Sequence, residues 1–206
     1  MKRRQFIKNA SLTGVGIAVG SSLTACNDTN EKTSTKEESK PMAIDTSKFP
    51  IAVCTWAFSK ANETAGKALS SGKKALDAAI EGVEIEEENL KNTTVGKGGA
   101  PDREGNVTLD ACVMDSNGDC GAVVYVNTIT NVAALAKKVM EDTPHVILAG
   151  EGAEEFGYSQ GFEKENLLTE ESRLAWEEWK KSPEYKPIIN IENHDTIGML
   201  LSLIHI

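Results

Sequence analysis

The sequence predicts a mixed α/β domain. Segments with helical spacing alternate with four short apolar segments that have strand character: residues 51–56, 107–114, 121–127 and 146–149. Asn117 and Gly118 lie between the second and third of these, and Asn-Gly is a strong signal for a tight hairpin turn. The alternation of strands and helices is typical of α/β proteins, whereas the hairpin implies that the sheet is at least partly antiparallel.

Three helices are predicted from apolar spacing and from residues typical of helix ends. The first contains Leu76, Ala79, Ile80 and Val83, and Gly72 is a plausible end for a helix before it. The second follows Asn131 as its N-cap and carries an apolar face. The third starts at residues 169–171, where two acidic residues suit the helix dipole.

Burial can also be predicted for several segments. We expect the strands at residues 51–56 and 146–149 to be buried, and a further apolar strand to begin at Thr196. Trp176 and Trp179, three residues apart on the third helix, are expected to pack into the core rather than to bind a ligand.

Composition narrows the classes of function. The formal net charge of −9 argues against nucleic-acid binding, for which a basic face supplies most of the affinity, and favours an acidic enzyme. The chain has four cysteines and no C-x-x-C pair, so a disulfide scaffold, a zinc site and a thioredoxin-type site are poorly supported. A two-residue turn at Asn117 and Gly118 would put Cys112 out of register with Cys120, so we expect buried thiols there rather than a disulfide.

Two polar segments could suggest ligand sites. The acidic run from Glu84 to Glu88 is expected to be a solvated helix face, because no histidine or ordered ligand spacing accompanies it. Residues 95–102 form a glycine-rich loop without the spacing of a P-loop or of a dinucleotide fingerprint. Its glycines therefore indicate tight backbone geometry or close packing rather than nucleotide binding.

Residues 1–26 have the layout of an export signal. A basic start with Arg3 and Arg4 precedes a glycine-diluted apolar run that is too short for a membrane span. The residues after Arg3 resemble a twin-arginine signal, with an ordinary secretory signal as the alternative. Leu23-Thr24-Ala25-Cys26 is similar to a lipobox, which would make Cys26 a lipidated first residue, whereas simple cleavage nearby would leave no anchor. Residues 27–48 are polar and are expected to be a disordered linker.

A polar stretch with two prolines, residues 182–193, is expected to be an exposed linker that runs into Asn193-His194-Asp195-Thr196 at the start of an apolar strand. Taken alone, this would be an ordinary start of a strand. Six motifs occur in order along the chain, however: Thr55-Trp56-x-Phe58, Gly72-Lys73-x-Ala75-Leu76-Asp77-Ala78, Val95-Gly96-x-Gly98-Gly99-x-Pro101-Asp102, Val107-Thr108-Leu109-Asp110-Ala111, Thr143-Pro144-His145-Val146 and Asn193-His194-Asp195-Thr196-Ile197-Gly198-Met199. Together they resemble the N-terminal half of a bacterial glycosylasparaginase, also called aspartylglucosaminidase.

This resemblance implies a fold and a division of the chain. Glycosylasparaginases are N-terminal nucleophile hydrolases with a four-layer αββα sandwich. Residues 49–195 would be the half that corresponds to the α-subunit, and residues 196–206 the start of the β-subunit. The two subunits would form an α/β heterodimer after self-cleavage, and these could pair further as dimers.

The resemblance also implies the site residues. Thr196 would attack the carbonyl of Asp195, with His194 and Asp195 as processing residues, and would then serve as catalytic nucleophile on a GlcNAc-linked asparagine. Trp56 matches the tryptophan that lines the substrate pocket, although an aromatic at a strand end is otherwise a core residue. A freed α-amino group, with a pKa of about 7.7–8.0, can act as the base that a threonine hydroxyl needs. Since Thr196 would supply its own base, His145 is expected to be structural, and the resemblance implies that neither a metal nor an organic cofactor is needed.

Two alternatives stay open at this point. One is an asparaginase or isoaspartyl peptidase of the same superfamily, and the other is a non-catalytic, lipid-anchored half-domain. Lys97 stands where the family usually has an aromatic residue, and Ser59 where glycine is common. Residues 201–206 no longer resemble the family, whose members continue well beyond the processing threonine. We therefore expect a truncated chain that by itself is inactive and exposes apolar surface.

Overall fold

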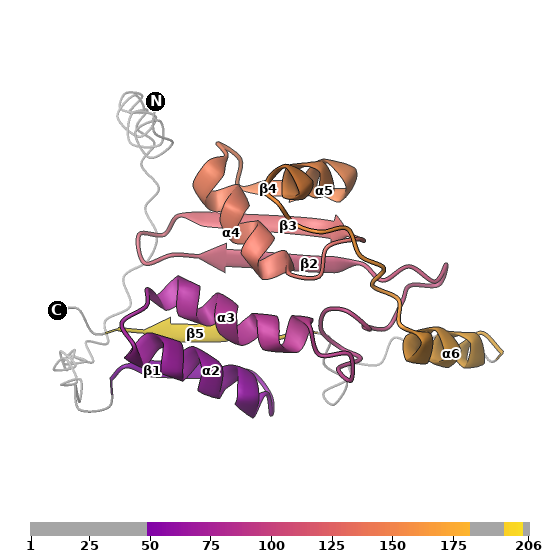
Figure 1. Ribbon diagram of the computed structural model, residues 1–206, viewed down its shortest axis with the longest axis horizontal. Coiled ribbons are helices and arrows are strands. Elements are labelled where there is room, and N and C mark those ends of the chain that lie inside the picture. The colour runs from indigo at the N-terminus through magenta and orange to yellow at the C-terminus, as the bar shows by residue number, and fades with distance from the viewer. Residues whose placement is uncertain (1–48, 182–195, 204–206) are drawn as a thin grey trace, which may run out of the picture. The chain divides into compact units, whose positions relative to one another are not determined.

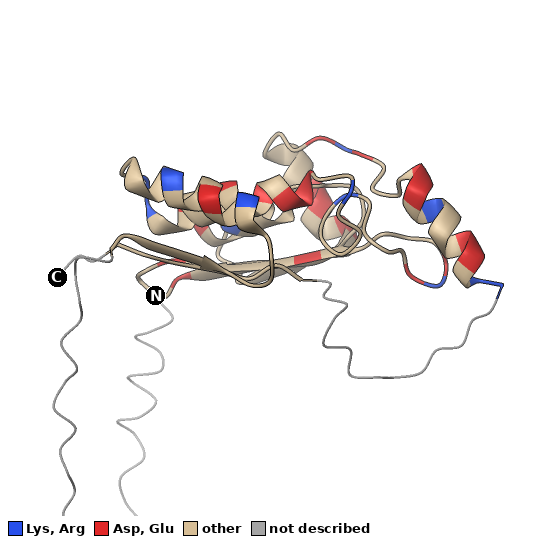
Figure 2. Cartoon of the chain, turned by 90° about the horizontal axis from the view of Figure 1, so that it is seen from below, with Lys and Arg blue, Asp and Glu red and all other residues tan. Residues whose placement is uncertain are grey.

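The computed structural model describes residues 49–181 and 196–203, all within one compact unit, Ile44–Ile206. Its strands form a two-stranded sheet and a three-stranded sheet, and helices cover one face of the strands (Figures 1 and 2). The predicted mixed α/β class is confirmed. The predicted leader with Cys26, the linkers at residues 27–48 and 182–193, His194 and Asp195 lie outside the described residues.

The two-stranded sheet joins the two ends of the described chain. Strand β1 (Ile51–Cys54) pairs antiparallel with β5 (Met199–Ser202), and the ladder runs from Ile51 opposite Ser202 to Cys54 opposite Met199. Helix α2 (Ser59–Ser70) packs on β1, and helix α3 (Ala75–Glu87) packs on α2 and β5. The buried apolar residues of these two helices are mostly small: Ala61, Ala65, Ala68, Leu69, Ala78 and Ile80.

Glycines allow α2 and α3 to pack closely and to connect tightly. Gly72 follows the end of α2 at φ 92°, a left-handed conformation that suits glycine, so its predicted role as a helix end is confirmed. In α3, a Cβ at Gly82 would lie 2.7 Å from the carbonyl oxygen of Ala61 on α2 and 2.9 Å from the sulfur of Met199. The lack of a side chain at Gly82 therefore brings α2, α3 and β5 together.

The three-stranded sheet has the order β2–β3–β4. Strand β2 (Leu109–Met114) pairs antiparallel with β3 (Cys120–Val126), which confirms the predicted hairpin, and β3 pairs parallel with β4 (Ile147–Ala149). The predicted two-residue turn is wrong. Met114 lies opposite Cys120, and the amide of Gly118 (φ 77°) donates to the Asp115 carbonyl, as in a three-residue loop that ends in a left-handed glycine.

The larger core lies between this sheet and its helices. Helix α4 (Val132–Asp142) packs on β2 and β3, and helix α5 (Gly150–Ser159) packs on β3 and β4. Eleven buried apolar residues form this core: Val107, Leu109, Val123, Val126, Ile129, Val132, Leu135, Ala136, Val139, Ala153 and Leu167. The apolar stripe predicted on the second helix thus faces the sheet.

The strand face turned away from the helices is bare in the described residues. Val53 and its cross-strand partner Leu200 are 54% and 80% exposed, and Ile147 on β4 is 53% exposed. The predicted burial of the strands at residues 51–56 and 146–149 is therefore wrong, because helices cover only one of their faces. Cys112 and Cys120 are free thiols, as expected, but both are exposed rather than buried. In a four-layer sandwich, a second sheet would pack on this bare face.

Helix α6 (Glu170–Trp179) begins as predicted, with the Thr169 side chain accepting a hydrogen bond from the amide of Ser172 at 3.2 Å. Its tryptophans do not enter the core, which corrects the prediction. Trp176 is half-buried and lies against Gly105, with its indole nitrogen 3.3 Å from the Arg103 carbonyl oxygen, and Trp179 is 42% exposed. This helix contacts a loop rather than the sheets, so its apolar side chains find only partial cover.

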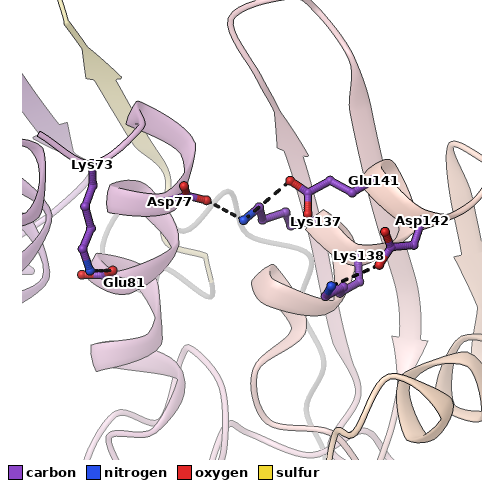
Figure 3. Close-up of polar contacts among 7 residues, drawn as sticks. All are labelled: Lys73, Asp77, Glu81, Lys137, Lys138, Glu141 and Asp142. Atoms are coloured by element: carbon purple, nitrogen blue, oxygen red, sulfur yellow. Dashed lines mark hydrogen bonds and ion pairs between the residues drawn. The ribbon is translucent and has the colours of Figure 1, made fainter.

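Two polar contacts connect α3, which covers the two-stranded sheet, to α4, which covers the three-stranded sheet. The Lys137 ammonium lies 2.5 Å from a carboxylate oxygen of Asp77 and 3.6 Å from one of Glu141, as Figure 3 shows. This pairing raises the pKa of Lys137, chiefly through the hydrogen bond to Asp77. At the other end of α3, Glu87 reaches the start of α4.

The acidic run is therefore not simply a solvated face, which corrects the prediction. Glu86 and Glu87 are 6% and 2% exposed. Oε1 of Glu87 accepts a hydrogen bond of 2.9 Å from the amide of Ala133 in the first turn of α4. The expected N-cap, Asn131, stands at the N-cap position but makes no side-chain cap, because its side-chain amide donates to Glu88 instead. A carboxylate distant in sequence thus satisfies an amide that α4 leaves unpaired.

A candidate active site at the Thr196 end of β1 and β5

Thr196 lies three residues before β5 and is exposed at the end of the β1–β5 pair. The ladder between these strands ends at Cys54 and Met199, so the residues beyond it must be held by other contacts. Those contacts come from Thr55 and Trp56, which directly follow the last paired residue of β1.

Thr55 binds both main-chain polar groups of Gly198. Its amide donates to the Gly198 carbonyl oxygen at 2.9 Å, and its hydroxyl Oγ1 accepts from the Gly198 amide at 2.9 Å. Its methyl group lies 3.3 Å from the position that a Cβ on Gly198 would occupy. Pairing between the two chain segments is thereby extended by one residue toward Thr196.

Trp56 binds the threonine itself. Its indole Nε1 donates a hydrogen bond of 3.1 Å to the carbonyl oxygen of Thr196. The backbone of Trp56 has φ 57°, a left-handed conformation that is uncommon for a bulky residue and that turns the chain out of the β1 direction. Two of the residues predicted for the site, Trp56 and Thr196, are therefore in direct contact. Trp56 is 52% exposed, so the indole is not a core residue.

The glycine-rich loop has the tight geometry that its sequence predicts. Gly96 and Gly98 have φ of 70° and 92°, and a Cβ on Gly96 would lie 2.2 Å from the carbonyl oxygen of Glu87. The amide of Lys97 donates to that same carbonyl oxygen at 2.9 Å, and Ser172 on α6 donates to the carbonyl of Gly98. The loop therefore packs on the end of α3 and on the start of α6.

Lys97, which departs from the family pattern, has a partner within this part of the structure. Its ammonium pairs with the carboxylate of Glu165, which also accepts a hydrogen bond of 2.9 Å from the Thr130 hydroxyl. The hydrogen bond from Lys97 is the main reason that the pKa of Glu165 is lowered. Lys97, in place of the usual aromatic residue, thus joins the glycine-rich loop to the segment before α6 through an ion pair with Glu165.

Glu87 is the most perturbed acid in this part of the protein. Burial raises its pKa to about 8, although the hydrogen bond from Ala133 acts in the opposite direction. Its second oxygen, Oε2, is buried and has no hydrogen-bond partner among the described residues. A carboxylate so desolvated favours the neutral form, because one oxygen can accept from Ala133 while the other carries the proton. The contacts given for Glu87 are with α4, through the Ala133 amide, and with the glycine-rich loop, through the Lys97 amide, so its role is in the packing of α3, α4 and the loop.

A shallow hollow of about 240 Å³ lies beside the site, on the strands themselves. It is lined by Val53, Cys54, Thr55, Gly198, Met199 and Leu200. Its lining is mostly apolar and includes neither Trp56 nor Thr196, so it belongs to the bare strand face rather than to a substrate pocket. Among residues 49–181 and 196–203, no three His, Cys, Asp or Glu side chains gather as a metal site would require. No helix in the same ranges has the length and apolar character needed to cross a membrane.

The sequence motifs contained Thr55 and Gly198, but nothing in the sequence assigned them a role. Their pairing joins residues 143 positions apart, so neither periodicity nor local spacing can reveal it. The only local signal is a hydroxyl residue directly after the last residue of β1 and directly before an aromatic residue. A hydroxyl residue at such a position is not distinctive by itself. Thr55 meets its partner Gly198 only because the segment before β5 lies beside it.

A mixed α/β half-domain with an exposed threonine three residues before a strand fits the class of N-terminal nucleophile hydrolases. A family model described as asparaginase matches residues 40–199, which is most of the chain. The chain belongs to the asparaginase family, and the resemblance seen in its motifs is confirmed at this level.

Similar proteins come from bacteria, animals and plants. An N(4)-(beta-N-acetylglucosaminyl)-L-asparaginase of Elizabethkingia miricola is 49% identical over 201 residues, which are 96% of this chain and 55% of that protein. A protein of the same name from Rattus norvegicus is 35% identical over 192 residues, covering 78% of this chain and 56% of that protein. A probable isoaspartyl peptidase/L-asparaginase 3 of Arabidopsis thaliana is 38% identical over 141 residues, which are 68% of this chain and 39% of that protein. The chain thus spans about half the length of the first two relatives.

Proposed function

We propose that this chain is the N-terminal half of a self-cleaving amidohydrolase of the glycosylasparaginase type, with Thr196 as its nucleophile. The substrate is the amide bond between N-acetylglucosamine and asparagine, and the process served is the degradation of glycoproteins. The observation that carries the proposal is the contact between Trp56 and Thr196, in a chain 49% identical to a protein named for this activity. The activity belongs to the whole protein, and the 206-residue chain alone is inactive.

The first step is self-cleavage between Asp195 and Thr196. The hydroxyl oxygen of Thr196 attacks the Asp195 carbonyl carbon, the carbon–nitrogen bond breaks, and the hydroxyl proton passes to the departing nitrogen. The result is an ester between the Asp195 carbonyl and the Thr196 oxygen, next to a free amine. Water then hydrolyses this ester, leaving a carboxylate on Asp195 and a free hydroxyl on Thr196. His194 and Asp195 are the processing residues in this step.

The second step uses the amine that the first step creates. The α-amino group of Thr196, with an unperturbed pKa of about 7.7–8.0, takes the hydroxyl proton as the oxygen attacks the substrate amide carbon. The glycosylamine leaves with a proton, and water resolves the aspartyl ester to aspartate and free enzyme. Before self-cleavage the nitrogen of Thr196 is an amide and cannot act as a base, so the precursor is inactive.

The geometry at the end of β1 supports a nucleophile at Thr196 in two ways. The residue is exposed, so a substrate can reach it, and its carbonyl is held by Trp56 rather than left to move. Trp56 is itself half exposed beside Thr196, where its ring can also line the pocket for the asparagine end of the substrate. No cofactor takes part in either step.

The proposal also covers where the protein acts and how its two pieces assemble. Residues 1–26 direct the protein out of the cytoplasm, with Cys26 as a candidate lipidation site, and the mature enzyme is periplasmic or membrane-anchored. After self-cleavage the two pieces remain together as an α/β heterodimer. These statements rest on sequence motifs and on the resemblance to the family.

A second candidate is an L-asparaginase or isoaspartyl peptidase of the same superfamily. It is supported by the 38% identity to the Arabidopsis thaliana relative, which is named for these activities. Purified mature enzyme offered N-acetylglucosaminyl-asparagine, L-asparagine and a β-aspartyl dipeptide in parallel separates the two candidates. Faster hydrolysis of the dipeptide than of the glycosylated substrate would favour the second.

Self-cleavage is tested on protein expressed from the complete gene. Intact-mass spectrometry is expected to show two fragments that meet between Asp195 and Thr196, whereas Thr196→Ala remains one chain without amidase activity. Thr196→Ser serves as the control that keeps a hydroxyl, and it should still be cleaved. A Thr196→Ala protein that still splits at this bond would rule out the mechanism.

A further inference from the structure

The contacts of Thr55 point to a role that the proposed activity does not by itself require. Trp56 and Thr55 are adjacent, and they bind alternate residues of the facing segment. Trp56 holds the carbonyl of Thr196, and Thr55 holds both polar groups of Gly198. Only Ile197 lies between the two residues that are held, so few backbone torsions near the nucleophile are left free.

The hydroxyl of Thr55 takes the place of a backbone acceptor. In a continuing antiparallel ladder, the amide of Gly198 would bond to a main-chain carbonyl of the facing strand. The chain turns away after Thr55, because Trp56 adopts φ 57°. The side-chain oxygen of Thr55 accepts from the Gly198 amide at 2.9 Å instead. A residue without a side-chain acceptor would leave this amide to solvent and loosen the segment that carries Thr196.

We infer that Thr55 is a positioning residue for Thr196, because its hydroxyl fixes Gly198 and so aligns the threonine oxygen with the carbonyl carbon that it attacks. This inference rests on the proposed function, since it assumes that Thr196 is the nucleophile. Thr55 acts on both reactions through Gly198 rather than by touching the reacting atoms. Reactions of held groups are sensitive to position, and a misplacement of about 1 Å can cost roughly 100-fold in rate.

Three variants of the protein expressed from the complete gene test the role of the hydroxyl. Thr55→Val replaces the hydroxyl with a methyl group at nearly constant shape, and Thr55→Ser restores the hydroxyl without the methyl. Thr64→Val makes the same exchange on helix α2 as a matched control. The rate of self-cleavage is followed by gel electrophoresis and mass spectrometry, and the thermal midpoint of each variant is recorded.

The expected result is slower self-cleavage only where the hydroxyl is lost. Thr55→Val should cleave at least about tenfold more slowly than wild type, because Gly198 loses its acceptor near the nucleophile. Thr55→Ser and Thr64→Val should cleave at close to the wild-type rate. The thermal midpoint of Thr55→Val should fall by no more than about 4 °C, since a single exposed hydrogen bond contributes little to stability.

The mature enzyme gives a second readout that a purely structural role would not produce. With a β-aspartyl anilide as the probe substrate, processed Thr55→Val should show a lower kcat at nearly unchanged KM, since positioning affects the chemical step rather than substrate binding. A raised KM with unchanged kcat would place Thr55 in the substrate pocket and overturn the inference.

The outcomes separate this inference from the proposed function. If wild type cleaves and folded Thr55→Val cleaves equally fast, the positioning role is wrong while Thr196 stays the nucleophile. If wild type and Thr196→Ala both remain uncleaved, the proposed function itself fails. Should Thr55→Val not fold, Thr55→Ser still decides: a folded serine variant that cleaves at least about tenfold more slowly than wild type shows that the hydroxyl is not what positions Thr196.

Discussion

The two sheets of this protein differ in how they are held together. The β2–β3–β4 sheet shares a core of eleven buried apolar residues with its helices, whereas helices α2 and α3 over the β1–β5 pair carry six buried apolar residues, four of them alanines, among the described residues. The end of the β1–β5 pair that carries Thr196 is instead held by hydrogen bonds from Thr55 and Trp56. The candidate active site therefore lies on the weakly buried part, and the strongly buried part acts as its scaffold.

This difference shows how a site can be precise without a large local core. Apolar burial supplies most of the free energy of folding but fixes directions poorly, whereas hydrogen bonds fix directions and contribute little net stability. Thr55 and Trp56 supply direction at the end of β1. Glu87 and Lys137 connect α3 to α4, and so connect the site-bearing region to the scaffold.

The largest expected effect compares a core leucine of the scaffold with a leucine on the bare face of β5. Leu135 on α4 is fully buried, and Leu200 on β5 is 80% exposed. In the 206-residue chain, Leu135→Ala should lower the free energy of unfolding by about 2–5 kcal/mol, because it leaves a cavity in the larger core. Leu200→Ala should change it by less than about 0.5 kcal/mol. Urea denaturation followed by circular dichroism measures both, and similar losses would mean that the two regions do not differ in burial.

A smaller effect concerns the pH dependence introduced by Glu87. The folded-state pKa of about 8 lies above the unfolded value near 4.5, so the folded protein holds this proton more tightly. The contribution of Glu87 is fully present below pH 4.5 and is lost as pH rises through 8. Glu87→Gln keeps the shape and the acceptor for Ala133 but cannot ionise. Its free energy of unfolding should therefore rise relative to wild type between pH 5 and 8, by on the order of 2 kcal/mol.

Urea titrations at several pH values measure this relative change, with Glu104→Gln as the exposed control that should leave the wild-type profile unaltered. Hydrogen exchange at the amide of Ala133 adds a local readout. It should quicken above pH 8 in wild type beyond the normal effect of pH, and should not do so in Glu87→Gln. A wild-type profile that runs parallel to that of Glu87→Gln across this range would contradict a buried, protonated Glu87.

The smallest expected effect concerns two neighbouring lysines on α4 that Figure 3 shows side by side. Lys137 pairs with Asp77 on α3, whereas Lys138 pairs with Asp142 on its own helix at 3.1 Å. Lys137→Met should cost about 0.5–1 kcal/mol of unfolding free energy and Lys138→Met less than about 0.5 kcal/mol, since both pairs are partly exposed. Both losses should shrink in 1 M salt. Equal losses in denaturation experiments would show that the contact between α3 and α4 adds nothing beyond a local helix pair.

Local features of the fold could be predicted from the sequence because their causes are local. Gly72 ends α2, Thr169 caps α6, and Asn117 and Gly118 mark the hairpin. The errors share a different cause. The burial of Glu87, the exposure of Ile147 and the incomplete cover of Trp179 depend on elements distant in sequence, which periodicity cannot place.

The candidate site follows the same division. Thr196 and Trp56 could be proposed from motifs, but their contact, and the partner of Thr55, depend on β5 returning to β1 across most of the chain. His194 and Asp195 remain predictions, as does Cys26, because they lie outside the described residues.

The sequence by itself determined the family, the mixed α/β class and the threonine at which cleavage is expected, because each depends on residue identity and order. Only the tertiary structure decided which groups surround that threonine. The antiparallel pairing of β1 with β5 brings Thr55 and Trp56 to Gly198 and Thr196, and the turn at Trp56 leaves a hydroxyl to serve as the last acceptor. Such contacts depend on where distant backbone segments meet, and the packing of the whole chain sets that meeting point.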